Sequence, residues 1–142
     1  MSAQSDLHHA CAALGTILFT VTVLDPDKDQ VWRSYTSHPV EYPLQGTKPQ
    51  TRDGWYEHCI AGKQTFVANT TPEFAKFFFD HALITSMGLG SAVNIPIWDD
   101  AGTVRLTVNL LAGPNHFTSE KLAAYGALVA TACPALLAEA AA

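Results

Sequence analysis

Four side chains in the middle of the chain are of types that carry protons near neutral pH: His38, His58, His81 and Asp80. Groups of this kind serve acid–base reactions such as isomerisation, hydration or C–C bond cleavage. Their spacing fixes no mutual geometry, so they form a set of candidate catalytic residues rather than a site. Taken alone, His81 fits a helix-capping or core position better than a catalytic one.

Cys59 follows His58 directly and adds a redox reaction as an alternative. A neighbouring imidazolium lowers the pKa of a thiol and makes it more nucleophilic. Adjacent residues of a helix point about 100° apart, however, so the two side chains need not meet. The cysteines Cys11, Cys59 and Cys133 are too widely spaced for a disulfide framework or a zinc motif, and no two histidines are four residues apart. The sequence therefore predicts no metal site and indicates no cofactor.

Binding of a small molecule is the chemistry that more of the chain favours. Cationic, aromatic, hydroxyl and amide side chains recur on the segments that we expect to surround a pocket. Such a set suits a carboxylate or a polar heteroaromatic ring. The candidate ligand-binding residues are Arg33, Tyr35, His38, Tyr42, Lys48, Trp55, His58, Asn69, His81, Asn94, Thr107 and Asn109.

A hairpin of two strands, 92–98 and 104–111, must position the last three of these residues. With a loop at 99–102, Trp98 is expected to pair with Thr103. The resulting pairs are Ile97 with Val104, Ile95 with Leu106 and Val93 with Val108 on one face, and Asn94 with Thr107 and Asn109 with Ala92 on the other. One face is apolar, as a core requires. The amides on the other face meet a polar ligand, solvent or a crossing loop.

An earlier hairpin, with strands 18–24 and 31–37 around a turn at 25–30, repeats the same division. Pairing Leu24 with Val31 predicts one apolar and one polar face. The apolar face holds Phe19, Val21, Val23 and Trp32, and the polar face holds Thr20, Thr22, Arg33 and Tyr35. Two independent hairpins thus indicate an antiparallel sheet that helices cover on one side only.

Helices are expected at both ends of the chain and at several points between. The apolar spacing of Leu7, Ala10, Cys11 and Leu14 predicts the first, and a stripe from Leu122 to Leu137 predicts the last, which Pro134 should kink. Shorter helices are expected from Trp55, capped by Asp53, and over 72–78 and 81–87, with Gly88 and Gly90 marking the end. The terminal helices should pack side by side on the apolar sheet face.

The segment 37–50 is expected to form a stiff extended loop over the pocket. Its three prolines exclude a helix or a central strand. It carries His38, Tyr42 and Lys48, and ordered loops are where binding groups concentrate. The alternative is a plain surface connection.

The order of these elements resembles the GAF domain family. The resemblance is carried by Leu83-Ile84-Thr85-Ser86-Met87-Gly88-Leu89-Gly90-Ser91-Ala92-Val93-Asn94-Ile95-Pro96-Ile97 and the strand 104–111, and extends in element order over nearly the whole chain. It implies an α+β fold in a single domain, residues 1–142, resembling GAF and PAS domains. The antiparallel sheet would have the N- and C-terminal helices on one face and a ligand pocket under loops and short helices on the other. It also implies a homodimer through the alanine-rich outer surfaces of the terminal helices.

Motifs of particular GAF subfamilies are only partly present. The Asn-Lys pair of cyclic-nucleotide-binding members is missing, because Thr70 follows Asn69. His81 before Met87-Gly88 is similar to phytochrome-like members. Asp80 stands where many of those have the bilin-attaching cysteine, so covalent bilin attachment is not supported. The cysteine spacing of the GAF-like free methionine sulfoxide reductases does not appear either.

The amino-acid composition limits the classes of protein and of partner that remain possible. The chain has 142 residues, of which 48% are hydrophobic and 15% charged, which is typical of one globular domain. A net charge of −5 without a basic cluster argues against nucleic acid as a partner. The absence of a long apolar run and of a secretory signal indicates a cytoplasmic protein that does not enter a membrane. We therefore expect a sensory domain that binds a polar or aromatic metabolite, with an acid–base enzyme or a cysteine-based reductase as alternatives.

Overall fold

The computed structural model describes residues 2–44, 46–78 and 80–141, so Gln45 of the predicted loop and Phe79 lie outside the described residues. A six-stranded antiparallel sheet has the order β3-β2-β1-β6-β5-β4. The strands are β1 (Leu18–Asp25), β2 (Gln30–Thr36), β3 (Lys48–Pro49), β4 (Phe66–Ala68), β5 (Ser91–Trp98) and β6 (Val104–Ala112). The fold is α+β, as the sequence predicts.

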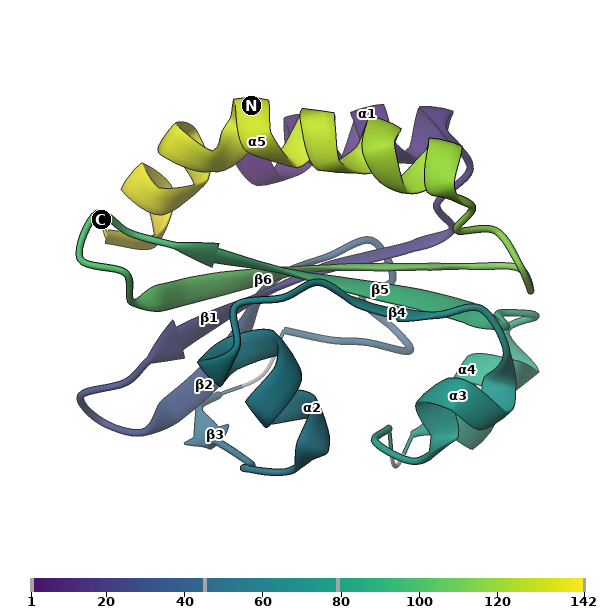
Figure 1. Ribbon diagram of the computed structural model, residues 1–142, viewed down its shortest axis with the longest axis horizontal. Helices are drawn as coiled ribbons and strands as arrows, with labels where there is room; N and C mark the ends of the chain where they lie inside the picture. Colours follow the sequence, from purple (N-terminus) through teal and green to yellow (C-terminus); the bar gives the residue numbers. More distant parts are fainter. Residues whose placement is uncertain (1, 45, 79, 142) are drawn as a thin grey trace.

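Helices cover the two faces of this sheet unequally (Figure 1). The long helices α1 (Ala3–Ala13) and α5 (Ser119–Ala141) lie side by side on one face. The shorter α2 (Gly54–Tyr56), the π-helical turn Glu57–Ala61, α3 (Thr71–Ala75) and α4 (His81–Ser86) lie on the other. The predicted division between terminal helices and short central helices is confirmed.

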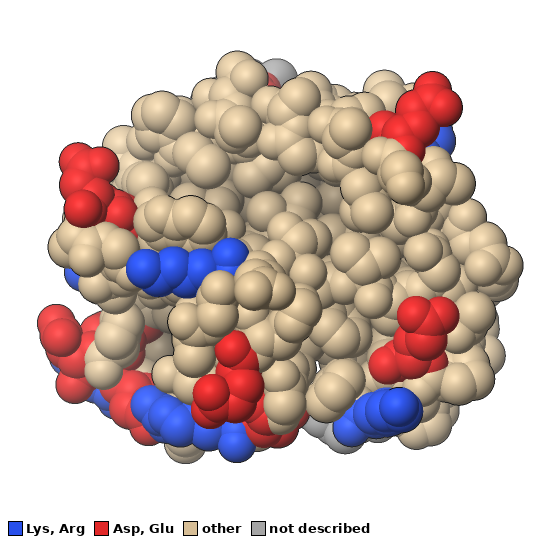
Figure 2. All heavy atoms as spheres, viewed as in Figure 1, with Lys and Arg blue, Asp and Glu red and all other residues tan. Residues whose placement is uncertain are grey.

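Helix α5 is long and apolar enough to cross a membrane by length and composition, the only such helix in the described part of the chain. This is weak evidence for a membrane segment, because a helix that covers a protein core passes the same test. Here α5 packs on the sheet through Tyr125, Val129 and Leu136. Its outer side is mostly uncharged in the space-filling view of Figure 2.

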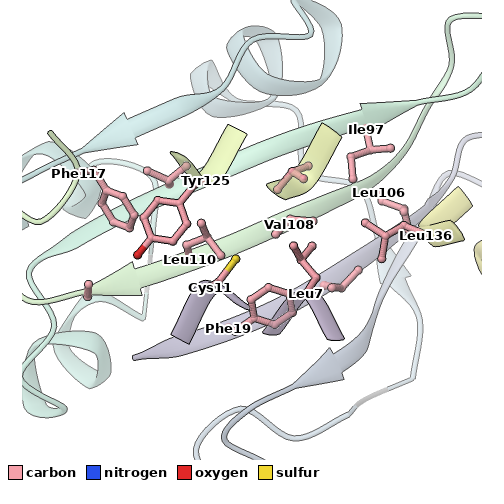
Figure 3. Close-up of a cluster of buried hydrophobic side chains, with 14 of the residues drawn as sticks. Leu7, Cys11, Phe19, Ile97, Leu106, Val108, Leu110, Phe117, Tyr125 and Leu136 are labelled. Atoms are coloured by element: carbon pink, nitrogen blue, oxygen red, sulfur yellow. The ribbon is translucent and has the colours of Figure 1, made fainter. Parts of the chain in front are cut away.

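The main core lies between the sheet and the terminal helices. Leu7 and Cys11 of α1 meet Val108 and Leu110 of β6 and Tyr125 of α5 in one buried cluster (Figure 3). The apolar stripes predicted for both helices are therefore confirmed.

Both predicted face divisions hold except at Tyr35 and Val104, and the register of the later hairpin differs by two residues over most of its length. Asn94 lies opposite Asn109, not opposite Thr107 as predicted. Asp99 Oδ1 accepts hydrogen bonds from the backbone N–H groups of Ala101 and Thr103, and Thr103 lies in the loop, so that Trp98 pairs with Val104. A bulge between Ile97 and Trp98 adds the second residue of the shift, so that Ile97 pairs with Leu106. A shift of two keeps the side chains from Ala92 to Ile97 and from Leu106 to Leu111 on their predicted faces, because strand side chains alternate with a period of two. Val104, beyond the bulge, is the exception and packs with Leu24 and Val31.

The predicted position of Tyr35 is wrong. The register of β1 and β2 shifts between Val21 and Thr22, so that Val21 pairs with Tyr35 and Thr22 pairs with Arg33. The extra residue, Ser34, turns Tyr35 to the helix-covered face. There its hydroxyl lies 2.7 Å from Nδ1 of His8.

The helix predicted from Trp55 is also different. Asp53 caps it as expected, accepting a hydrogen bond from the backbone N–H of Tyr56 at 2.9 Å. After one turn, however, the backbone widens into the π-helical turn Glu57–Ala61. Trp55 and Cys59 both contact Asn94, whereas His58 is exposed.

Candidate functional site

A cavity of about 310 Å³ lies on the polar face of the sheet, opposite the terminal helices. The floor comes from β1 and β6. The walls and roof come from β2, Tyr42, the segment 46–55, and the described part of the α3–α4 region. Described residues that line the cavity are Leu18, Thr20, Thr22, Leu24, Val31, Trp32, Arg33, Tyr42, Gly46, Lys48, Pro49, Gln50, Thr51, Asp53, Trp55, Phe77, Phe78, Asp80, Ile84, Thr107, Asn109 and Leu111. Apolar and aromatic residues make up about half of these lining residues, and most of the rest are polar or charged. Such a mixture suits a small-molecule site.

A chain of amide hydrogen bonds runs through the floor. Trp55 Nε1 donates to Asn94 Oδ1 at 2.9 Å, and Asn94 Nδ2 donates to Asn109 Oδ1 at 2.8 Å. Asn109 Nδ2 in turn donates to the hydroxyl oxygens of Thr20 at 3.1 Å and Thr22 at 3.2 Å. Buried amides need such partners. This network therefore fixes the Trp55 indole against three strands of the sheet.

A second polar contact joins the two halves of the roof. The Tyr42 hydroxyl, from the proline-rich loop, donates a hydrogen bond to Asp80 Oδ2 beside α4. Burial, together with this bond to a carboxylate, raises the pKa of Tyr42, so the hydroxyl stays protonated at neutral pH. One side-chain contact thus closes the loop against the α3–α4 region.

Arg33 lies beside this contact. Its Nη1 donates to the backbone carbonyl of Pro43 at 2.7 Å, and its Cζ lies 5.1 Å from the centre of the Tyr42 ring. These contacts hold the guanidinium at the cavity wall without neutralising it. The ion pairs in the described part of the chain are Arg52–Asp29 and Arg105–Asp99, so neither Arg33 nor Lys48 has a carboxylate partner there.

Solved structures of known proteins share this architecture. The GAF domain of a two-component sensor histidine kinase from Bacillus halodurans superposes with a TM-score of 0.68 at 13% identity, covering 95% of this chain and 96% of that one. The GAF domain/HD domain protein from Geobacter sulfurreducens gives 0.72 at 13% identity, with 94% and 88% covered. The chain has the GAF fold.

The same GAF fold also occurs in an enzyme. A free methionine-R-sulfoxide reductase from Neisseria meningitidis, solved in complex with its substrate, is similar with a TM-score of 0.59 and 17% identity, covering 94% of this chain and 79% of that one. No protein-family model and no curated protein matches the sequence.

The GAF cavity brings together about half of the residues predicted from the sequence. Six candidate ligand-binding residues and one candidate catalytic residue line it: Arg33, Tyr42, Lys48, Trp55, Thr107, Asn109 and Asp80. Asn94 does not line the cavity, because its amide is buried beneath Trp55 and is bonded on both sides. Its contribution is to hold the indole in place.

The other candidates lie elsewhere, so the predicted set is not one site. His58 and His81 are exposed, and His58 Nε2 lies 3.0 Å from the Thr65 carbonyl. Nδ1 of His38 lies 2.7 Å from Ser37 Oγ. The Asn69 amide bonds the backbone N–H and carbonyl of Phe117, both at 3.0 Å, and thereby ties β4 to the segment before α5. Tyr35 lies on the opposite face of the sheet, as described above.

Cys59 is unsuited to the thiolate chemistry considered from the sequence. Its side chain is fully buried, and its thiol contacts the Asn94 carbonyl at 3.7 Å. Burial raises the pKa of Cys59 to about 12. His58 does not lower the pKa of this thiol. His58 is exposed and Cys59 points inward, because adjacent helical residues point in different directions.

Several cavity residues were not among the candidates. Strand alternation already predicts that Thr20 and Thr22 lie on the polar face, so this pattern alone is enough to make them candidates. Phe77, Phe78 and Ile84 come from irregular or short helical segments whose inward sides the sequence pattern does not reveal. Within residues 2–44, 46–78 and 80–141, no group of three or more His, Cys, Asp or Glu side chains is placed to hold a metal ion.

Proposed function

We propose that this GAF domain binds a small polar or aromatic metabolite in the cavity on the polar sheet face and acts as a sensory module. The supporting observation is the cavity of about 310 Å³ itself, with fixed polar groups among apolar and aromatic side chains. This volume is at the lower end of the roughly 300–1,000 Å³ typical of ligand sites, which favours a small metabolite.

The roof offers a route by which binding can change the conformation. The Tyr42–Asp80 hydrogen bond links the proline-rich loop to the α3–α4 region, and both segments line the cavity. A ligand under this contact would hold the two segments together and protect the loop from proteolysis. A sensor needs a difference of this kind between its free and bound states.

The enzymatic alternatives have less support. Of the four candidate proton carriers only Asp80 lines the cavity, and its carboxylate already accepts the Tyr42 hydrogen bond. A cysteine-based reductase needs a thiolate, which the pKa of Cys59 disfavours. The free cysteines Cys11, Cys59 and Cys133 fit the cytoplasm, where we propose that the protein resides.

Binding in the cavity can be tested with a substitution that fills it. Thr107 is buried in the floor, and Thr107→Phe places an aromatic ring in the space. Val40→Phe is the control, because Val40 is 87% exposed and does not line the cavity. The protein should be purified natively, analysed by native mass spectrometry for a co-purifying compound, and screened by thermal shift against a panel of small metabolites.

We expect a ligand to raise the melting temperature of the wild type and of Val40→Phe, because a ligand that binds only the folded state stabilises it. Thr107→Phe should unfold cooperatively without any ligand-induced shift. An equal shift in Thr107→Phe would place the ligand elsewhere. The absence of any co-purifying compound together with the absence of any shift across the panel would contradict the proposal.

A further inference from the structure

We propose that the cavity selects an organic anion, a carboxylate attached to an aromatic or branched apolar group. This inference rests on the proposed function and names the ligand class. It follows from the donors of the cavity, because the hydroxyl and cationic N–H groups that line it are mostly without an acceptor in the described contacts.

Several acceptors of the cavity are engaged by the protein, although the carboxylates of Asp53 and Asp80 keep further acceptor positions. Asn94 Oδ1 receives the Trp55 N–H, and Asn109 Oδ1 receives the Asn94 amide. Asp80 Oδ2 receives the Tyr42 hydroxyl, and Asp53 Oδ1 receives a backbone N–H at the start of α2. A ligand rich in N–H or O–H groups would have to compete for these atoms.

Several hydroxyl donors of the cavity floor, in contrast, are not used by the protein. The hydroxyl oxygens of Thr20 and Thr22 accept from Asn109, which leaves the proton of each hydroxyl for another acceptor. Thr107 lines the same floor. Three hydroxyl donors on neighbouring strands thus face the cavity, and an acceptor-rich group such as a carboxylate satisfies them best.

Two cations lie at the β2–β3 side of this floor. Lys48 pairs with Val31 across β2 and β3, and Arg33 follows two residues after Val31 on the same strand. Side chains in such a diagonal relation are about 7–8 Å apart at the backbone and lie on one face. Both residues line the cavity. Thr22 pairs with Arg33 on β1 and completes the cluster.

Arg33 is prepared for an anion by its surroundings. The Pro43 carbonyl and the Tyr42 ring fix the guanidinium but use only one of its five N–H donors in the described contacts. A guanidinium held in this way binds a carboxylate through two parallel hydrogen bonds with little loss of side-chain freedom.

The rest of the cavity determines the other end of the ligand. Trp55, Phe77, Phe78 and Ile84 line it together with Leu111. The indole of Trp55 is held by Asn94 and offers a fixed flat surface. An aromatic ring or a branched hydrocarbon fits this wall, and its carboxylate then reaches towards Arg33 and Lys48.

The charge of the ligand can be tested with compounds of one shape. We would measure the affinities of benzoate, benzamide, benzylamine and phenyl phosphate, and of phenylacetate and its amide, by isothermal titration calorimetry. Benzoate or phenylacetate should bind at least about 10-fold more tightly than the corresponding amide. Phenyl phosphate distinguishes a general anion site from a carboxylate site and should bind more weakly than benzoate.

Equal or tighter binding of the amides or of benzylamine would overturn the anion inference but would leave ligand binding in place. Failure of the whole series to bind would also overturn it. In that case a neutral compound found by native mass spectrometry would preserve the proposed function, whereas an empty cavity would contradict both.

Substitutions identify the residues responsible. Arg33→Gln should weaken carboxylate binding by about 10- to 100-fold and the amide much less. Arg33→Lys keeps the charge but loses the paired hydrogen bonds, so it should recover only part of the affinity. Because Lys48 is exposed, Lys48→Gln should weaken binding by a smaller factor that decreases with added salt.

Lys28→Gln is the matched control, since it removes the same charge from an exposed turn outside the cavity. It should bind benzoate like the wild type. Should Arg33→Gln and Arg33→Lys both fold and both retain full preference for carboxylate over amide, the proposed anion site would be wrong.

Discussion

The buried thiols of Cys11 and Cys59 make the stability of the protein sensitive to alkaline pH. Both side chains are fully buried, and burial raises the pKa of each to about 12, compared with 9.0 for an unperturbed thiol. Between these values the folded state retains protons that the unfolded chain has lost. The free energy of unfolding must therefore fall as pH rises from about 9 to 12.

We predict that the Cys11→Ala, Cys59→Ala double variant loses stability less steeply than the wild type over this pH range. Urea unfolding at several pH values measures the difference, and the slope of each variant is compared with its own value at neutral pH. Some loss remains in the variant, because burial also raises the pKa of Tyr42 and Tyr125. Parallel pH profiles for the two proteins would show that the thiols do not ionise on unfolding in this range.

At the residue scale, strand alternation was the most reliable guide to the cavity. It placed Arg33, Thr107 and Asn109 on the polar face, and each of them lines the cavity. The histidines carried no such signal. Residue type alone made His58 and His81 candidates, and whether they face a cavity depends on helices too short to show a periodicity.

At the scale of elements, the two hairpins show what periodicity can and cannot determine. Alternation identified the apolar and polar faces of both up to the bulges, because within a regular strand the face depends only on whether a residue number is odd or even. The register depends on loop hydrogen bonds, such as those of Asp99, and on single inserted residues, such as Ser34. Neither changes the composition of a strand, so Tyr35 could not be placed correctly from the pattern.

The junction between α4 and β5 depends on two glycines for different reasons. Gly88 has a φ of +79°, which ends the helix in a conformation that other residues rarely adopt. Gly90 instead lies against the turn after β6, where an added Cβ would be 2.5 Å from Pro114 Cγ and 3.1 Å from Pro114 Cα. Its N–H also donates to the Ala112 carbonyl at 2.9 Å, which fixes the backbone in place.

Gly90→Ala should therefore destabilise the protein by about 1–3 kcal/mol, as overpacking of a tight contact usually does. Gly113→Ala is the neighbouring control, because an added Cβ there has no atom within 4 Å and the change should stay within about 0.5 kcal/mol of neutral. Urea denaturation of both variants tests the contact. Similar stabilities would mean that Pro114 moves aside at little cost.

At the scale of the whole molecule, the sheet separates two environments. One face is sealed by α1 and α5 into a continuous core, and the other carries the cavity under a roof of short helices and loops (Figure 1). Ligand-dependent changes in the roof can therefore occur without opening the main core. The order of elements was enough to predict this arrangement from the sequence, whereas the volume and lining of the cavity depend on the irregular segments.

The outer side of α5 is an apolar surface that is exposed in the single chain. An apolar 18-residue stretch of this helix is only 17% buried within the chain. Ala123, Ala127 and Ala130 are exposed along it, and small side chains let two helices approach closely. We propose that a second copy of this chain packs against the surface formed by α1 and α5. The mostly uncharged surface over α5 in Figure 2 supports this, because obligate interfaces are depleted in charge at their centres.

The proposed dimer makes a prediction that sedimentation can test. Wild-type protein should sediment as a dimer at micromolar concentrations, and Ala127→Arg combined with Ala130→Arg should give a folded monomer, because two like charges would have to be buried in the seam. Ala101→Arg, in the exposed loop between β5 and β6, adds a charge elsewhere and should leave the dimer intact. A monomeric wild type, or a double variant that still dimerises, would mean that this face of α5 does not form the interface.

Ligand binding should survive in the monomer, since the cavity lies on the other face of the sheet and every described residue that lines it belongs to the same chain.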